Sequence, residues 1–453
     1  MTINMPTQPR ATVNTQRLAI SRAFWIAVYV LMIVSPLIIL VLGGRPIERE
    51  PLRELSVILA FVGFSLMGLQ FVPTARLPMF SNLFDMDTLY ALHHRLSIAA
   101  FVAVLAHPIL LFVNNPFTLR LLNVFTAPWR ARAAVAATLF LIVLVVTSVW
   151  RKQLEIHYEA WHWVHDILSM LIAGFALYHI FKINYYTAVP AQRILWIVLA
   201  VLWAMMIGYT RLVRPWMLLR RPYEVTEVKE EYGEAWTLTV KPVGHRGLIF
   251  RPGQFAWLVA WKSPFAISYH PFSFSSSAVQ PERLQFTIKE LGDWTNTVKE
   301  MAVGKTIYVD GPYGVFGPDM HDAPGYVFIA GGSGVAPFMS MLRTFADRGD
   351  QRPVQFYYGN WKWDTIICRD ELAALEERLN LELVHVLEEP PEGWEGEVGY
   401  VTPQLLDRRL PRARADYEYF LCGPLIMIDK VEEALEGLGV SKRRIHSEKY
   451  EMA

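Results

Sequence analysis

Residues 90–113 read YALHHRLSIAAFVAVLAHPILLFV, and residues 160–183 read AWHWVHDILSMLIAGFALYHIFKI. Each stretch is apolar and long enough to cross a bilayer as one helix. Each holds two histidines fourteen residues apart: His93 and His107 in the first, His165 and His179 in the second. Fourteen residues fall only about 40° short of four helical turns, so both members of a pair face the same way, about 21 Å apart along the axis. Two such helices side by side would present two histidine pairs, one near each face of the bilayer.

A polar imidazole inside hydrocarbon is costly and usually faces a partner or a cavity. An interhelical hydrogen bond explains a single histidine, and neutral imidazole also binds the zinc or copper of a metal transporter. Four histidines in two matched pairs favour haem ligation, because a repeat of about 21 Å suits two large flat cofactors better than closely spaced ion sites. His94 lies about 140° off the face of His107, so we expect His93 to be the ligand.

Composition sets the broad class of the protein. The chain has 453 residues, enough for about three domains, and 53% of them are hydrophobic. The 43 basic and 42 acidic residues nearly balance, which gives no sign of nucleic-acid binding. Two cysteines, Cys368 and Cys422, neither build a disulfide scaffold nor match zinc spacing, and they fit a reducing cytosol.

The apolar residues concentrate before about residue 215, where six stretches are long enough to span a membrane. The first 22 residues are polar and basic and lead into an apolar stretch without a cleavage site, so we expect a cytoplasmic tail (1–22) and a retained first span. The loops alone leave the orientation undecided. The basic run RLVRPWMLLRRP after the last span favours a plasma (inner) membrane protein with both termini cytoplasmic. The predicted spans are residues 23–42, 55–72, 90–113, 133–150, 160–182 and 193–209.

The texture of the sequence changes after residue 215. Short strand-like runs at 236–240, 255–259, 284–289 and 306–309, punctuated by glycine and proline, predict an antiparallel β-barrel over residues 216–320. Strands then alternate with helices, which predicts an α/β nucleotide-binding domain over residues 321–453. The predicted fold class is thus a multidomain membrane protein: a six-helix transmembrane bundle (23–215), then the β-barrel, then the α/β domain.

Three glycine-containing turns follow one another in the soluble half, and their order is typical of dinucleotide binding. Asp310–Gly314 reads DGPYG, the run from Gly331 through Ser333 to Pro337 reads GGSGVAP, and Cys422-Gly423-Pro424 follows a late strand. Small residues let backbone amides approach a pyrophosphate, and a helix N-terminus favours its charge. The run HPFSFSS (270–276) closes a barrel strand with aromatic and hydroxyl groups that could stack on and hydrogen-bond a flavin.

With these motifs the chain resembles the ferric reductase and NADPH oxidase transmembrane family over nearly its whole length. LHHRLS is similar to the opening of that family's third span, and this similarity makes His93 the haem ligand. The resemblance implies FAD, NADPH or NADH, and two haems b ligated by His93, His107, His165 and His179. It also assigns residues to FAD and to the nicotinamide dinucleotide: His270, Pro271, Phe272, Ser273, Ser275, Ser276, Gly292, Trp294, Thr295, Gly331, Gly332, Ser333, Gly334, Pro337, Asn360, Arg369, Cys422, Gly423, Pro424, Glu448 and Tyr450.

The implied activity is that of a flavocytochrome b of the NAD(P)H oxidase or ferric reductase type. Electrons would pass from cytosolic NAD(P)H through FAD, then through an inner haem (His93 and His165) and an outer haem (His107 and His179), with no acid–base residue required. Bis-imidazole ligation leaves no open iron position, so these haems would carry electrons rather than bind substrate. We expect O₂ as the acceptor, giving superoxide. Ferric or cupric complexes and a periplasmic partner enzyme are the alternatives, and membrane lipid surrounds the bundle.

The nicotinamide preference stays open at this stage. A cation near the adenosine ribose would favour the 2′-phosphate of NADPH. Lys362 and Arg369 are the available cations, although Lys362 could equally be a solvated surface residue.

Overall fold

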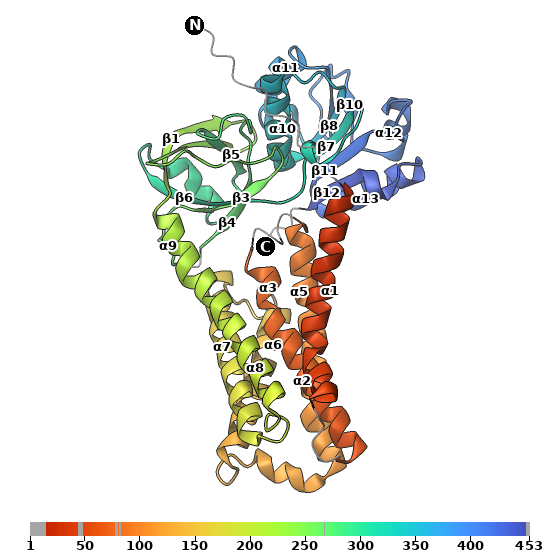
Figure 1. Cartoon of the computed structure of the whole chain (residues 1–453). Coiled ribbons are helices and arrows are strands. Elements are labelled where there is room, and N and C mark those ends of the chain that lie inside the picture. Colours follow the sequence, from red (N-terminus) through yellow and green to blue (C-terminus); the bar gives the residue numbers. More distant parts are fainter. Residues whose placement is uncertain (1–14, 44–48, 78–79, 81–82, 267, 450–453) are drawn as a thin grey trace.

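The structure, a computed structural model, describes residues 15–43, 49–77, 80, 83–266 and 268–449. A bundle of long helices forms one half of the molecule, and a β-sheet lobe and an α/β lobe sit together at one end of it (Figure 1). Helix α1 (Thr15–Leu42) begins at that end, and the loop holding the 3₁₀-helix η1 (Pro116–Leu122) lies at the opposite end. The bundle therefore has a lobe side and a far side.

Six helical segments in the described part of the chain are long and apolar enough to cross a membrane, as the sequence predicts. All six lie in the half of the chain before residue 220, and short loops join most of them (Figure 1). The helices are α1, α2 (Pro51–Leu69) with its short continuation α3 (Phe71–Thr74), α5 (Met86–Asn114), α6 (Trp129–Val149), α7 (Tyr158–Ile183) and α8 (Pro190–Gly208).

Helix α2 is the most buried of the six spans, since 56% of the residues in its most apolar stretch are buried. Its glycines explain how its neighbours come so close. A Cβ on Gly63 would lie 2.9 Å from Val104 of α5, and one on Gly68 would lie 2.0 Å from the Trp203 ring of α8. Small residues let helix backbones approach in this way within a membrane. Close packing on α2 thus fixes the position of α5, the helix that carries His93 and His107.

The last span runs directly into the soluble half. Helix α8 continues through a π-helical turn (Tyr209–Val213) and α9 (Arg214–Leu219), and β1 (Pro222–Glu231) begins three residues later. This continuous arm connects the bundle to the β-sheet lobe (Figure 1). Because no flexible linker intervenes, the arm fixes where the lobe stands on the bundle.

The β-sheet lobe is one antiparallel sheet of six strands in the order β4-β3-β6-β1-β2-β5. A bridge between Phe274 and Phe286 joins the two edges of the sheet, so the sheet curls on itself around an apolar core. This is the predicted antiparallel barrel. Its strands are β1, β2 (Ala235–Pro242), β3 (Phe255–Val259), β4 (His270–Ser273), β5 (Leu284–Lys289) and β6 (Thr306–Tyr313).

The α/β lobe holds a parallel sheet in the order β10-β9-β8-β7-β11-β12. One apolar core lies under α10 (Val335–Arg348) and α11 (Arg369–Glu376), and another lies under α12 (Pro403–Arg409) and α13 (Leu425–Gly437). The strand order reverses between β7 and β11, which is where such sheets bind ligands. The predicted fold class is therefore confirmed. The strands are β7 (Tyr326–Gly331), β8 (Val354–Asn360), β9 (Leu381–Leu387), β10 (Glu397–Val398), β11 (Glu418–Gly423) and β12 (Ile445–Lys449).

Candidate functional site

The lobe-side histidine pair consists of His93 on α5 and His165 on α7. Their ring centroids lie 6.3 Å apart, with the ring planes inclined at 59°. A metal–imidazole bond is about 2 Å long, so two imidazoles on opposite sides of one metal have centroids about 6 Å apart. The spacing of this pair therefore fits two axial ligands of one iron atom.

Hydrogen bonds orient the ring of His165. Its Nδ1 lies 3.3 Å from the Ser148 hydroxyl oxygen on α6, and that hydroxyl donates its own hydrogen to the Leu144 carbonyl at 2.6 Å. Because a serine hydroxyl has one hydrogen to donate, Ser148 is left to accept from the Nδ1–H of His165. The tautomer this selects leaves Nε2 with a free electron pair, as metal ligation requires.

The far-side pair consists of His107 on α5 and His179 on α7, the two helices whose other histidines, His93 and His165, face each other. Both far-side rings are oriented by main-chain oxygens. The Nδ1 of His107 lies 3.1 Å from the carbonyl oxygen of Ser56, and the Nδ1 of His179 lies 2.8 Å from that of Arg130. Both rings thereby take the tautomer that leaves Nε2 available.

The structure also separates His93 from His94, its neighbour in the sequence. The His93 side chain is half-buried beside His165, whereas that of His94 is exposed on the outside of the helix. The Nδ1 of His93 is buried without a hydrogen bond of normal geometry, and the backbone of Gln70 lies close to it. The helical argument for His93 over His94 agrees with this placement.

The predicted flavin residues come together on one side of the barrel. The ring of Trp294 stacks on His270 at 4.5 Å between centroids and on Phe272 at 5.2 Å. Burial lowers the pKa of His270 to about 4, so its imidazole is neutral at physiological pH. Trp294, in the segment after β5, thus packs face to face against two residues of β4, which gathers the predicted flavin residues into one aromatic cluster.

This aromatic cluster lies close to the membrane bundle. Glu159, in the first turn of α7, interacts electrostatically with His270 and forms an ion pair with Lys262 of the barrel at 3.3 Å. His165 follows Glu159 on the same helix by six residues, which is about 9 Å of axial rise. The predicted flavin residues therefore lie nearer to the lobe-side pair than to the far-side pair.

The hydroxyls of Thr295 and Ser275 accept hydrogen bonds from inside the protein, whereas the hydroxyl of Ser276 is buried without a partner among the described residues. The Thr295 hydroxyl accepts from the backbone N–H groups of Leu291 and Gly292, both at 2.9 Å, which closes the turn before η3 (Thr295–Glu300). Ser275 accepts from Thr287 within the buried core, and Ser276 accepts from Ser340 of α10 through its carbonyl oxygen. These contacts shape the site, and direct binding of FAD by these residues stays a prediction.

The predicted glycine turns meet where the strand order reverses. A Cβ on Gly334 would lie 2.1 Å from the carbonyl oxygen of Cys422, and Gly423 lies against the backbone of Gly331. Ser333 and Gly332 form the turn that enters α10, whose first residues include Pro337. Only glycine allows the turns after β7 and β11 to approach so closely, and together they form a backbone cradle at a helix N-terminus, as a dinucleotide needs.

The expected adenosine region lies at the end of β8. The side-chain amide nitrogen of Asn360 is buried and makes no hydrogen bond of normal geometry to the described residues, and the Tyr358 side chain lies close to it. Arg369 lies between the rings of Tyr232 and Trp363, at 4.1 and 4.9 Å. Lys362 pairs with Glu389 at 3.2 Å. Both cations considered for the ribose phosphate are thus already engaged.

The remaining predicted contacts fall at strand ends. Pro271 pairs with Trp257 and Ser273 with Phe255, both across β3 and β4. Glu448 on β12 pairs in register with Cys422 on β11, beside the glycine cradle. Pro424 follows directly as the residue before α13. Tyr450 lies outside the described residues.

Sequence reasoning missed a polar cluster between the bundle and the barrel. Asp310, the first residue of DGPYG, is buried and accepts hydrogen bonds from Arg214 at 3.0 and 3.1 Å and from Arg76 at 3.5 Å. Tyr313 also donates to Asp310 at 2.8 Å and contacts Arg214. Arg76 in turn lies over the Trp257 ring at 4.1 Å. The cluster ties three membrane-side and barrel segments into one interface.

Comparison with protein families agrees with this order of parts. Residues 59–176 match the ferric reductase like transmembrane component, residues 234–316 an FAD-binding domain, and residues 328–433 the oxidoreductase NAD-binding domain. The chain thus combines a transmembrane component, an FAD-binding domain and an NAD-binding domain, in that order. The chain has the domain architecture of the ferric reductase and NADPH oxidase family.

Individual relatives match the soluble half. NADH-cytochrome b5 reductase 1 of Lodderomyces elongisporus is 36% identical over 184 residues, which is 39% of this chain and 60% of that protein. Its counterpart in Emericella nidulans is 33% identical over 186 residues, 39% of this chain and 59% of that one. The chain spans about 60% of the length of such relatives. A flavohemoglobin structure from Malassezia yamatoensis, 17% identical, covers 88% of this chain and 97% of that one at a TM-score of 0.48.

Proposed function

We propose that this protein moves electrons across a membrane from NAD(P)H, through FAD and two bis-histidine b-type haems, to an acceptor on the far side. The carrying observation is the pair His93 and His165 at 6.3 Å, with the flavin residues on one side and the far-side pair on the other. This arrangement supports a path from the α/β lobe through the barrel into the bundle.

The chain's own residues have positioning roles in this proposal. The cradle at Gly331–Gly334 and Gly423 binds the dinucleotide backbone, and Trp294 with His270 and Phe272 forms the aromatic cluster for the flavin. When bound, FAD accepts a hydride and passes electrons on singly, and the haems carry single electrons. His93, His107, His165 and His179 would hold the two haem irons, and no side chain is needed as an acid or a base.

The basic end of the last span supports a cytoplasmic location for the soluble lobes. Two of its arginines have partners: Arg211 pairs with Asp166 of α7, and Arg214 with Asp310. Arg220 and Arg221 remain near the surface at the lobe side. Cations at a membrane boundary favour the cytoplasmic face. Both lobes and the first turn of α1 would therefore lie on the cytoplasmic side of the plasma (inner) membrane.

Dioxygen is the acceptor we propose, with one electron reducing each O₂ to superoxide, so that one NAD(P)H yields two superoxide ions. A small neutral acceptor needs no shaped site beside the far-side pair. A ferric chelate is the second candidate. It is favoured by cations at the far-side helix ends, since Arg49 precedes α2, Arg130 lies in the first turn of α6 and Lys182 lies in the last turn of α7. An anionic chelate would be attracted to them. A periplasmic partner enzyme is the third.

The test starts with the purified full chain in detergent, supplied with FAD. A low-spin b-type spectrum at about two haems per chain is expected, and NAD(P)H under nitrogen should reduce it. Admission of O₂ should then reoxidise it and generate superoxide that superoxide dismutase removes. Oxygen-independent turnover with a ferric chelate alone would select the second acceptor, and turnover only with an added protein the third. A protein that never binds haem would contradict the whole proposal. Rates with NADH and NADPH decide the nicotinamide preference.

A further inference from the structure

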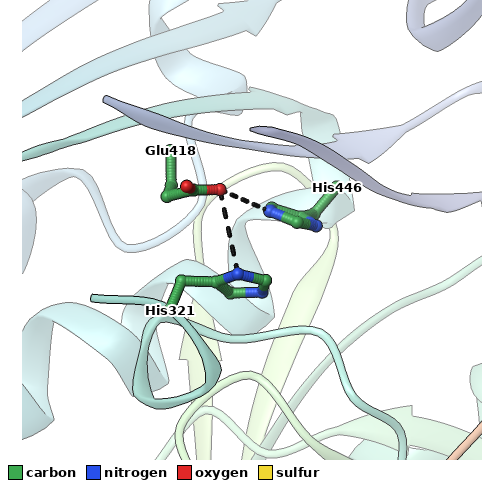
Figure 2. A group of neighbouring side chains, drawn as sticks. All are labelled: His321, Glu418 and His446. Carbon is green, nitrogen blue, oxygen red and sulfur yellow. Dashed lines mark hydrogen bonds and ion pairs between the residues drawn. The ribbon is translucent and has the colours of Figure 1, made fainter. Parts of the chain in front are cut away.

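Three metal-ligand side chains meet on the α/β lobe, where His446 lies within electrostatic range of Asp85, the residue before α5. His321 follows the short helix η4 (Pro318–Met320), Glu418 opens β11, and His446 lies on β12 (Figure 2). They come from three segments of the chain, separated by 97 and 28 residues. Figure 2 shows both imidazoles directed at one carboxylate oxygen of Glu418.

The distances within this cluster suit one small cation. Oε2 of Glu418 lies 2.7 Å from Nε2 of His446 and 3.8 Å from Nδ1 of His321, and all three ligand atoms lie within 4.8 Å of one another. Around a tetrahedral zinc ion with bonds of about 2.0–2.1 Å, neighbouring ligand atoms are about 3.3 Å apart. The two observed distances bracket that value, so small side-chain rotations would close the site.

The surroundings also suit a bound metal. The carboxylate of Glu418 is 9% exposed, and the imidazoles of His321 and His446 are 24% and 20% exposed, so the site is sheltered but open to water on one side. The other carboxylate oxygen of Glu418 accepts from Arg444 at 2.9 Å, which fixes the direction of the carboxylate as partners around metal ligands do. The two imidazole rings partly stack, with their centroids 3.9 Å apart, so binding of one metal by both would have to swing the rings apart to about 5 Å between centroids.

We propose that His321, Glu418 and His446 form a zinc site with water in the fourth position. Two imidazoles and one carboxylate are the donors that borderline divalent ions such as Zn²⁺ prefer. The rival explanation is a metal-free cluster in which His446 donates a hydrogen bond to Glu418. On binding, the metal replaces the hydrogen on the ligating nitrogen, and any proton carried by the site leaves to solvent.

The position of this site would let a bound ion tie three segments of the α/β lobe together. Glu418 begins β11 and Gly423 ends it, and five residues of strand correspond to about 16 Å. The metal would therefore be well separated from the glycine cradle. It would hold the edge strand β12, which carries Glu448, to β11 and to the segment before β7. Because the ion binds only where the three segments are together, it would stabilise the folded lobe.

The experiment uses the full chain with FAD and its haems bound and without a polyhistidine tag. The oxidised protein is dialysed against Zn²⁺, and bound metal is counted by mass spectrometry. We expect about one zinc per chain in the wild type, lost in Glu418→Gln and in His446→Asn. His157→Asn, at an exposed histidine before α7, is the matched control and should keep the zinc. Equal zinc content in all four proteins, or none in the wild type, would overturn the proposal.

X-ray absorption at the zinc edge of the wild type tests the ligand set without relying on a variant that fails to fold. Two imidazoles with oxygen ligands are expected. A spectrum with sulfur, or with water oxygens only, would contradict the site. Since no NAD(P)H is added and no electron transfer is measured, a negative result here leaves the proposed electron path untouched, and failure of that path leaves this site untouched.

Discussion

The two histidine pairs have the same spacing in the sequence, but the protein orients them differently. In the far-side pair, both Nδ1 atoms face main-chain carbonyl oxygens, those of Ser56 and Arg130. In the lobe-side pair, His165 faces a side-chain hydroxyl, and the Nδ1 of His93 has no hydrogen bond of normal geometry. A main-chain carbonyl remains when its residue is mutated, whereas a side-chain hydroxyl can be removed by mutation.

The lobe-side pair also lies within reach of the interface between bundle and barrel. The ring of Trp161 lies 5.2 Å from that of His165 between centroids, tilted by 51°, and its indole N–H donates to Ser148 at 3.3 Å. Glu159, two residues earlier, contacts the barrel. The far-side pair contacts only helices of the bundle in the described structure. The lobe-side pair is thus the one whose properties the soluble lobes can tune, and the far-side pair is fixed by the bundle itself.

Removing one ligand from each pair should have the largest effect and should separate their roles. His93→Ala and His179→Ala should each lower the haem content from about two to about one per chain, because a lost axial ligand removes half of the ligation. With NAD(P)H under nitrogen, the haem remaining in His179→Ala should be reduced, whereas the haem remaining in His93→Ala should stay oxidised. Pyridine haemochrome assays and anaerobic spectra measure both. Equal reduction in the two variants would refute the order of the pairs.

Breaking the interface cluster should slow transfer into the bundle without loss of haem. Asp310→Asn leaves Arg214 and Arg76 without their counter-charge, and uncompensated buried charges cost about 3–5 kcal/mol. We expect the rate of haem reduction by NAD(P)H to fall roughly tenfold or more, since each 1.4 kcal/mol of lost docking is a factor of ten. Stopped-flow spectroscopy measures this rate, and ferricyanide reduction by the haem-free protein reports the flavin step alone.

Glu159→Gln provides the control for that prediction. It removes the other ion pair across the interface, with Lys262, but both partners are about half exposed, and such surface pairs contribute little. Haem reduction should therefore stay close to the wild-type rate. If Asp310→Asn slows ferricyanide reduction as much as haem reduction, the cluster acts on the flavin or nucleotide site rather than on docking.

These comparisons show which features the sequence could reveal. The fourteen-residue spacing predicts the facing of His93 and His165 because a helix converts spacing into direction, and β3 and β5 match their predicted ranges because their apolar runs are bounded by turns. Strand β1 was not predicted, because charged residues interrupt its run and only its first half is buried. The local sequence pattern therefore predicts an element correctly where that element buries an apolar face of its own.

Contacts between distant segments left no local signal. Asp310 meets Arg76 across 234 positions, and His321, Glu418 and His446 meet from three segments. The sequence also gives no signal for the carbonyl oxygens of Ser56 and Arg130, since every residue has one. Tertiary structure alone brings them to a histidine.

The smallest expected effect is also the sharpest test of the difference between the pairs, because it compares two serines. Ser148→Ala removes the acceptor of the His165 Nδ1–H, whereas Ser56→Ala keeps the carbonyl that serves His107 and loses only a hydroxyl bond to the Arg53 carbonyl. A hydrogen-bonded Nδ1–H makes imidazole a more basic ligand and favours the oxidised metal, so its loss should raise the potential of the lobe-side haem. A net hydrogen bond of about 1 kcal/mol corresponds to roughly 40 mV for one electron. Spectroelectrochemical titration should therefore show one of two haem potentials raised in Ser148→Ala and neither changed in Ser56→Ala. A shift in both variants, or in the far-side haem, would mean that main-chain and side-chain partners do not divide the pairs as the structure indicates.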